Sequence, residues 1–288
     1  MNPGRTRDTE LQYLKRAAQI VEAIGEHQGC GAEQVEADTV AKWLYGRRTA
    51  ITARTFRLYR AALAFYYDHH GKEGDLIRNT SHDRDCVKAK HGLTSSRKKK
   101  YIPQKSAGRL VSLLRNHGGK WGDFTADVFQ ATLSCGLRPI EWNTAKLVGD
   151  RLCIQNAKAT NGRGNGPVRT LILHAEAADQ ASKVIDRIKR LPRGVNWHNA
   201  VRVTLRTVRM QYYPKSQYTL YTARHQFSAN AKASESRRRV ADLMGHRSVD
   251  TAAVHYGRRV SGWKQDRAVP AYLGMPAKEN RPGKTRSG

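Results

Sequence analysis

The sequence predicts a mainly α-helical protein with a small β-sheet, divided into two domains by a basic linker. Apolar residues recur every three to four positions along most of the chain, one stretch alternates like strands, and one polar stretch shows neither pattern. A length of 288 residues suits two domains of ordinary size. We expect domains at residues 1–80 and 105–275, a linker at 81–104 and a basic disordered tail at 276–288.

The first domain is expected to be helical. Its first apolar face consists of residues at helical spacing, namely Leu11, Leu14, Ala18, Val21 and Ile24. A second, short helix follows Asp38 as its cap, and a third covers residues 52–71. Three basic residues interleave with the apolar positions of the third helix: Arg54, Arg57 and Arg60. They form either a solvated face or a DNA-contacting face, and the sequence leaves both interpretations open.

The linker is polar and basic. It ends in a run of four cations: Arg97, Lys98, Lys99 and Lys100. This run is either a solvated tether or a strap that neutralises DNA phosphates between two modules. Both interpretations fit the linker taken alone.

The second domain combines helices with one hairpin. The segments RLCIQ and VRTLIL alternate in polarity and flank a turn rich in Gly and Asn, which predicts a β-hairpin. Helices are expected at residues 105–116, 124–134, 175–190, 195–210, 222–234, 237–244 and 249–256.

The charge is the most informative bulk property. Lys and Arg total 52 against 24 acidic residues, which gives a net charge of +28. Such an excess favours a polyanionic partner, and nucleic acid is the leading candidate. No apolar run is long enough to span a membrane, and no secretory signal is visible. The four cysteines are scattered without C-x-x-C spacing, which argues against a metal site and suits a reducing cytoplasm.

Four local patterns in the second domain carry residues suited to phosphate chemistry. Arg138 follows a glycine in CGLRPIEW, and Lys158 lies late in the hairpin. The segment YTARHQF places Tyr221 and Arg224 at a helix start. The segment LMGHRS contains His246, and Tyr256 follows that histidine ten residues later. Each pattern alone has an ordinary structural explanation, but their combination and order are specific.

This order resembles the tyrosine recombinase family, the phage-type integrases, over about residues 106–263. The helical N-terminal segment resembles the core-binding domain of that family more weakly. The resemblance implies a two-domain fold, with a helical core-binding domain and an α/β catalytic domain that together clamp duplex DNA.

The resemblance also implies a role for each motif residue. Arg138 and Arg224 would hold the scissile phosphate, and two permanently charged, bidentate groups suit that task. Tyr256 would be the nucleophile and form a 3′-phosphotyrosyl bond. Lys158 would protonate the leaving 5′-oxygen, and His246 would hydrogen-bond the phosphate. The covalent bond conserves the energy of the phosphodiester, so no metal or other cofactor is expected.

The implied partners follow from the same family. We expect double-stranded DNA, a homo-tetramer on paired sites and an accessory DNA-bending protein, with no membrane partner. The expected location is the cytoplasm, in association with the nucleoid.

Two positions depart from the family pattern. Tyr221 stands where the family has the histidine of H-x-x-R, so proton transfer at that position is in question. The family more often has its nucleophile nine residues after the Gly-His histidine, and His255 occupies that place here. A one-residue insertion before Tyr256 accounts for the second departure.

Three other functions compete with the recombinase. The first is a catalytically weakened DNA-binding regulator on the same fold, which only Tyr221 favours. The second is a basic RNA-binding assembly protein, which would not need the ordered Arg, Lys, Arg, His and Tyr set. The third is a relaxing topoisomerase, which uses related chemistry without a sequence-specific tetramer.

Overall fold

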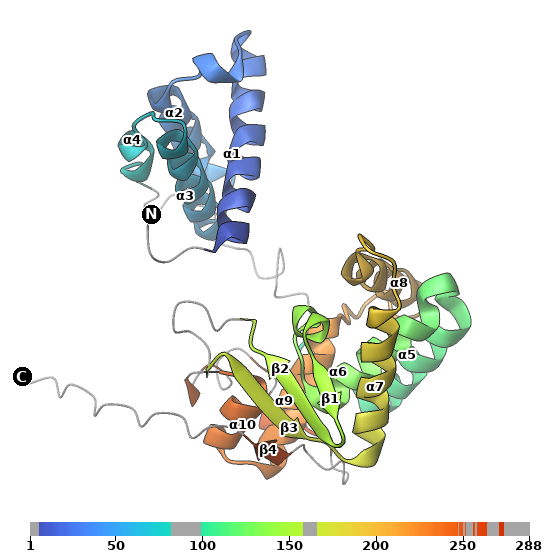
Figure 1. The fold of residues 1–288 in the computed structure, drawn as a ribbon. Coiled ribbons are helices and arrows are strands. Elements are labelled where there is room, and N and C mark those ends of the chain that lie inside the picture. Colours follow the sequence, from blue (N-terminus) through green and yellow to red (C-terminus); the bar gives the residue numbers. More distant parts are fainter. Residues whose placement is uncertain are drawn as a thin grey trace, which may run out of the picture. The chain divides into compact units, whose positions relative to one another are not determined.

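The computed structural model describes residues 6–81, 99–157, 166–246, 248–249, 251, 256, 258–263 and 271–273. The chain divides into two compact units, Met1–Ser96 and Arg97–Gly288. Figure 1 labels the helices and strands of both. Within the described ranges, no helix is both long and apolar enough to cross a membrane.

The N-terminal unit is helical, as the sequence predicts. Its helices are α1 (Arg7–Gln28), α2 (Ala37–Gly46), α3 (Ala53–His69) and the short α4 (Asp75–Arg78). The hydroxyls of Thr6 and Thr52 accept backbone N–H groups and so cap α1 and α3. The predicted cap Asp38 is wrong, because α2 begins one residue earlier and Asp38 lies in its first turn.

The three arginines of α3 differ in their surroundings. Arg54 and Arg57 are exposed. Arg60 is partly buried and donates from Nη1 to the backbone oxygen of Thr80 at 3.1 Å. Arg60 therefore helps to hold the chain after α4, while Arg54 and Arg57 remain available on the surface.

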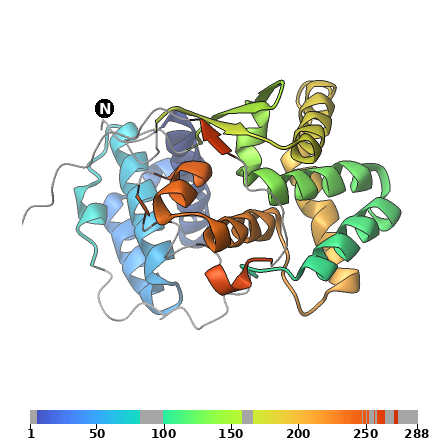
Figure 2. The ribbon, with the colours of Figure 1, turned by 90° about the horizontal axis from the view of Figure 1, so that it is seen from below.

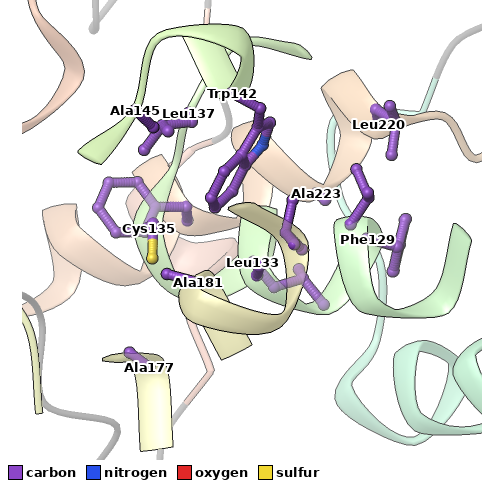
Figure 3. Close-up of a cluster of buried hydrophobic side chains, with 14 of the residues drawn as sticks. Phe129, Leu133, Cys135, Leu137, Trp142, Ala145, Ala177, Ala181, Leu220 and Ala223 are labelled. Atoms are coloured by element: carbon purple, nitrogen blue, oxygen red, sulfur yellow. The ribbon is translucent and has the colours of Figure 1, made fainter. Parts of the chain in front are cut away.

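The second unit is built around one buried helix. Its helices are α5 (Gln104–His117), α6 (Gly122–Cys135), α7 (Ala175–Lys189), α8 (Trp197–Tyr212), α9 (Leu220–Ser234) and α10 (Arg237–Met244). Helix α6 packs against α5, α7, α8 and α9. Figure 3 shows side chains from this core, including Phe129, Leu133, Cys135, Trp142, Ala181 and Ala223. These six helices confirm the predicted ones, whereas the predicted helix 249–256 falls largely outside the described residues.

The sheet of this unit is antiparallel, in the order β1-β2-β3-β4. Its strands are β1 (Lys146–Val148), β2 (Arg151–Gln155), β3 (Val168–Ile172) and β4 (Ala271–Leu273). Strands β2 and β3 are the predicted hairpin, with Leu152 opposite Leu171. Figure 2 shows β4 beside β3, although about a hundred residues separate them in sequence. The sequence analysis missed β1 and β4, because three residues are too few to show alternation.

The end of the predicted linker belongs to the second unit. Ile102 is fully buried, and its N–H donates to Gln226 Oε1 at 3.1 Å. Its carbonyl accepts from Trp263 Nε1 at 2.9 Å. Ile102 is therefore packed into the second unit rather than free, whereas Tyr101 is exposed. The part of the linker at 82–98 and the predicted tail at 276–288 lie outside the described residues.

Gly136 is the turn that ends α6 just before Arg138. Its φ is 67°, and a Cβ there would lie 2.2 Å from Cδ1 of Phe227. Gly149 has a similar φ of 59° but open space around it.

We predict that Gly149→Ala lowers the free energy of unfolding by about 1–2 kcal/mol, the cost of left-handed backbone. Gly136→Ala should cost about 1–3 kcal/mol more, because the ring of Phe227 must move. Urea denaturation measures both, and equal losses would contradict the packing argument.

Candidate active site

Arg138 is placed by the turn after α6 and by its own neighbour in sequence. It precedes the short helix η5 (Pro139–Asn143), whose third residue is Glu141. The backbone N–H of Arg138 donates to Glu141 Oε2 at 2.7 Å, and its Nη1 donates to Oε1 at 2.5 Å. Both side chains are buried. These two bonds from Arg138 to one carboxylate fix its guanidinium against the end of α6.

Arg224, in the second turn of α9, is fully buried. It donates from Nη1 to the carbonyl of Gly136 and from Nη2 to that of Met244, the latter at 2.8 Å. Its Nη2 also lies 3.5 Å from His246 Nε2. Burial, followed by the charge of Arg138, lowers the pKa of Arg224 to about 10. The group therefore stays charged at neutral pH while it joins the ends of α6 and α10.

Glu141 is the carboxylate that these arginines share. Its Oε2 lies 2.8 Å from Nη2 of Arg169 and 3.7 Å from Nη1 of Arg224. Burial alone would raise the pKa of Glu141. The charge and hydrogen bond of Arg169, followed by the charges of Arg224 and Arg138, outweigh burial and hold that pKa well below its usual range. Three buried guanidinium groups thus surround one carboxylate, and this excess of positive charge favours an anion.

His246 and Tyr256 complete the cluster. His246 is buried directly after Gly245, the turn that ends α10, and its ring centroid lies 4.9 Å from that of Tyr256. The Tyr256 hydroxyl accepts a hydrogen bond from Arg224 Nε at 3.3 Å. The structure therefore brings four of the six predicted catalytic residues into one cluster: Arg138, Arg224, His246 and Tyr256.

The remaining predicted residues are either outside the described residues or away from the buried arginines. Lys158, Arg97 and Lys98 lie outside the described residues. Tyr221 is 45% exposed and lines a pocket of about 750 Å³ beside α8. Within the described part of the chain, no hydrogen bond joins its hydroxyl to the buried arginines. The predicted hydrogen-bonding role of Tyr221 therefore stays a prediction.

Lys99 and Lys100 are exposed at the start of the second unit. The backbone N–H of Lys99 donates to the carbonyl of Gln217 at 3.2 Å. Lys100 lies near enough to α9 for its charge to lower the pKa of His225. Of the four predicted linker cations, Lys99 is thus held beside Gln217 and Lys100 lies near His225.

Comparison with solved structures identifies this architecture. The lambda integrase, solved as a tetramer bound to a Holliday junction, covers 92% of this chain and 76% of its own at 14% identity, with a TM-score of 0.57. The Tn1549 transposon integrase, in complex with a circular intermediate DNA, covers 89% of this chain and 91% of its own at 15% identity, with a TM-score of 0.53. The chain has the tyrosine-recombinase fold. No protein-family model and no curated protein matches the sequence.

Within this tyrosine-recombinase fold, His225 is a neighbour of Tyr256 that the sequence analysis did not assign. Their ring centroids lie 4.8 Å apart. Burial, followed by the charges of Lys100, Arg224 and Lys232, lowers the pKa of His225 to about 4. A neutral imidazole therefore lies beside the phenol. Its only sequence signal is that it follows Arg224, and adjacent helical residues point in different directions.

Glu141 and Arg169 were also left without a role by the sequence analysis. Glu141 stands three residues after Arg138 in the motif, which is the spacing that lets it cap the same turn. Arg169 occupies an inward-facing position of the hairpin, where an apolar residue is expected. A charge at such a position was the signal available in the sequence.

We predict that Glu141→Gln destabilises the second unit by about 3–5 kcal/mol at neutral pH, because three buried cations lose their shared anion. The folded-state pKa is depressed, so this stabilisation is fully present above the unfolded-state pKa of about 4.3. It is lost as pH falls further, toward the folded pKa. Denaturation of the wild type and the variant between pH 7 and pH 3 should therefore show a gap that narrows only below about pH 4.

Asp179→Asn is the matched control for this prediction. Asp179 pairs with Lys183 at 2.7 Å, but both side chains are well exposed. Exposed pairs contribute little to stability, because water screens both charges. If the two variants lost similar stability, Glu141 would not be the shared counter-ion of the cluster.

Proposed function

We propose that the protein is a site-specific DNA recombinase that cleaves and rejoins strands through a 3′-phosphotyrosyl intermediate. The carrying observation is the hydrogen bond from Arg224 Nε to the hydroxyl of Tyr256 at 3.3 Å. This bond places a tyrosine oxygen at a buried cluster that has more positive than negative charge. A nucleophile beside an anion-binding site is the arrangement that phosphoryl transfer needs.

The proposed reaction conserves one phosphoester bond. Tyr256 loses its phenolic proton to solvent, its oxygen attacks phosphorus, and the bond from phosphorus to the 5′-oxygen breaks. Arg138 and Arg224 hold the non-bridging oxygens, where negative charge increases in the transition state. His246 adds a hydrogen bond to the phosphate, and Lys158 delivers a proton to the leaving oxygen. Attack by the 5′-hydroxyl of a partner strand then reverses the step and releases the tyrosine.

The proposed partner is double-stranded DNA. The protein has a net charge of +28, and binding to a polyanion would reduce the repulsion among its positive charges. Exposed Arg54 and Arg57 of α3, and Lys99 and Lys100, supply cations to the DNA backbone. The solved lambda integrase is a tetramer on a junction, and the Tn1549 integrase is bound to DNA. A homo-tetramer on paired sites, assisted by a DNA-bending protein, belongs to the same proposal.

A DNA-binding regulator with weakened catalysis is the second candidate. Tyr221 favours it, because an exposed tyrosine stands where the resemblance expects a histidine. Four clustered motif residues favour the recombinase instead. Covalent adduct formation separates the two candidates.

We predict that Tyr256→Phe abolishes the covalent protein–DNA adduct, because only the phenolic oxygen can attack the phosphate. DNA affinity should stay within about three-fold, since the cationic cluster is unchanged. The measurement is a denaturing gel after incubation with nicked DNA that carries candidate recombination sites, with binding assayed in parallel. Tyr218→Phe, at a buried tyrosine whose ring meets that of Tyr213 edge to face, serves as the control and should still form the adduct. Adducts that persist in the Tyr256→Phe protein would assign the nucleophile to another residue.

A separate prediction concerns Tyr221. If its hydroxyl binds the phosphate once DNA is present, Tyr221→Phe should slow single-turnover cleavage by about 100- to 1,000-fold, the effect of losing one transition-state donor. Tyr221→His should keep most of the rate, because imidazole donates from a similar place. Cleavage by Tyr221→Phe at the wild-type rate would show that the hydroxyl has no part in the reaction.

A further inference from the structure

Arg169 is a charged residue in an apolar setting. It lies on β3 opposite Ile154 of β2, and only 1% of its surface is exposed. Side chains alternate along a strand, so Arg169 shares its face of the sheet with Leu171, Leu152 and Ile154, all fully buried. An arginine in such a place is costly unless other groups satisfy it.

The first group that satisfies Arg169 is Glu141. Nη2 of Arg169 donates to Oε2 at 2.8 Å, and Nη1 donates to Oε1 at 3.2 Å. This two-pronged contact fixes the orientation of the carboxylate as well as its charge. The same two oxygens accept the backbone N–H and Nη1 of Arg138. The position of Arg138 therefore follows from that of Arg169.

The second group is Asn156, at the end of β2. Its Oδ1 accepts from Nη1 of Arg169, and its Nδ2 donates to the carbonyl of Gly166 at 2.9 Å. The N–H of the next residue, Ala157, donates to Glu141 Oε1 at 3.3 Å. Arg169 and Glu141 together thus hold the end of the hairpin where β2 finishes and β3 begins.

The third contact is with Gly245, at the end of α10. A Cβ at Gly245 would lie 2.8 Å from Nη1 of Arg169 and 2.6 Å from Oδ1 of Asn156. The backbone just before His246 therefore rests directly on this pair. Three separate segments, ending in Arg138, Ala157 and His246, meet at one buried guanidinium.

We infer that Arg169 is a positioning residue, which aligns Arg138 and His246 for an oxyanion without touching that oxyanion itself. The inference rests on the proposed function where it concerns strand cleavage. It also makes a claim about anion binding that can be tested without cleavage.

The experiment compares Arg169→Met, Arg169→Lys and Arg151→Met. Arg151 is an exposed arginine on the adjacent strand and is the matched control. Single-turnover cleavage at saturating DNA should fall about 100-fold in Arg169→Met, the scale of a misplaced catalytic group. DNA affinity should stay within about two-fold, because a buried residue adds little to the surface charge. Arg169→Lys should recover part of the rate, since one ammonium keeps the charge but not the two-pronged geometry.

A second readout separates positioning from general stability. Arg169→Met and Glu141→Gln are combined and compared with Glu141→Gln alone. If Arg169 positions Arg138 through Glu141, the double variant should cleave no more than about three-fold slower than Glu141→Gln, because the effects of coupled residues do not add. Losses that multiply would overturn the inference.

Orthovanadate is the probe that does not depend on strand cleavage. We expect it to raise the melting temperature of the wild type and of Arg151→Met, and to raise that of Arg169→Met by less than half as much. An unchanged rise in Arg169→Met would overturn the inference. If the wild type cleaves no DNA, yet orthovanadate raises its melting temperature more than that of Arg169→Met, the proposed function fails and the positioning role stands. If the wild type shows neither, both fail. Should Arg169→Met not fold, Arg169→Lys carries the same comparisons.

Discussion

The candidate site depends on the ion pairs that the carboxylate of Glu141 makes with three arginines. Three guanidinium groups approach it from three parts of the second unit: Arg138 after α6, Arg169 on β3 and Arg224 on α9. Without a shared anion, these cations would repel one another inside an apolar core. Among the described residues, Glu141 is the one carboxylate paired with these three cations, so the four groups together carry a net positive charge. One carboxylate is enough to hold the three cations together but not enough to neutralise them. The remaining positive charge is what favours the binding of a phosphate.

The fold was largely predictable because most of its elements carry a local signal. Alternating polarity around a Gly- and Asn-rich turn predicts the hairpin, and apolar residues at three- to four-residue spacing predict the long helices. The elements that were missed lack such a signal. Strand β4 exists because Ala271–Leu273 pairs with β3, and Ile102 is buried because Gln226 and Trp263 bond its backbone. Both are long-range facts that no short window contains.

The site divides in a similar way. Arg138, Arg224, His246 and Tyr256 were found because their order along the chain resembles a family pattern, and the structure brings them together. The residues that hold them were not found. Arg169 acts through contacts with β2, η5 and the end of α10, and these contacts exist only after folding. A charged residue on the inward face of a strand departs from the expected apolar pattern, and this departure was the one sign of Arg169 in the sequence.

Hydrogen bonds between the chain after Tyr256 and the core limit how far the tyrosine can move. The carbonyl of Ser261, five residues after Tyr256, accepts from Gln226 Nε2 of α9 at 2.8 Å. Trp263 is anchored as well, because its backbone N–H donates to Asn230 Oδ1 at 3.0 Å and its Nε1 donates to the carbonyl of Ile102. At about 3.5 Å per residue, a fully extended chain of five residues spans about 18 Å. With these bonds in place, the backbone of Tyr256 stays within that distance of Ser261, and the phosphate that it attacks must come to this part of the second unit.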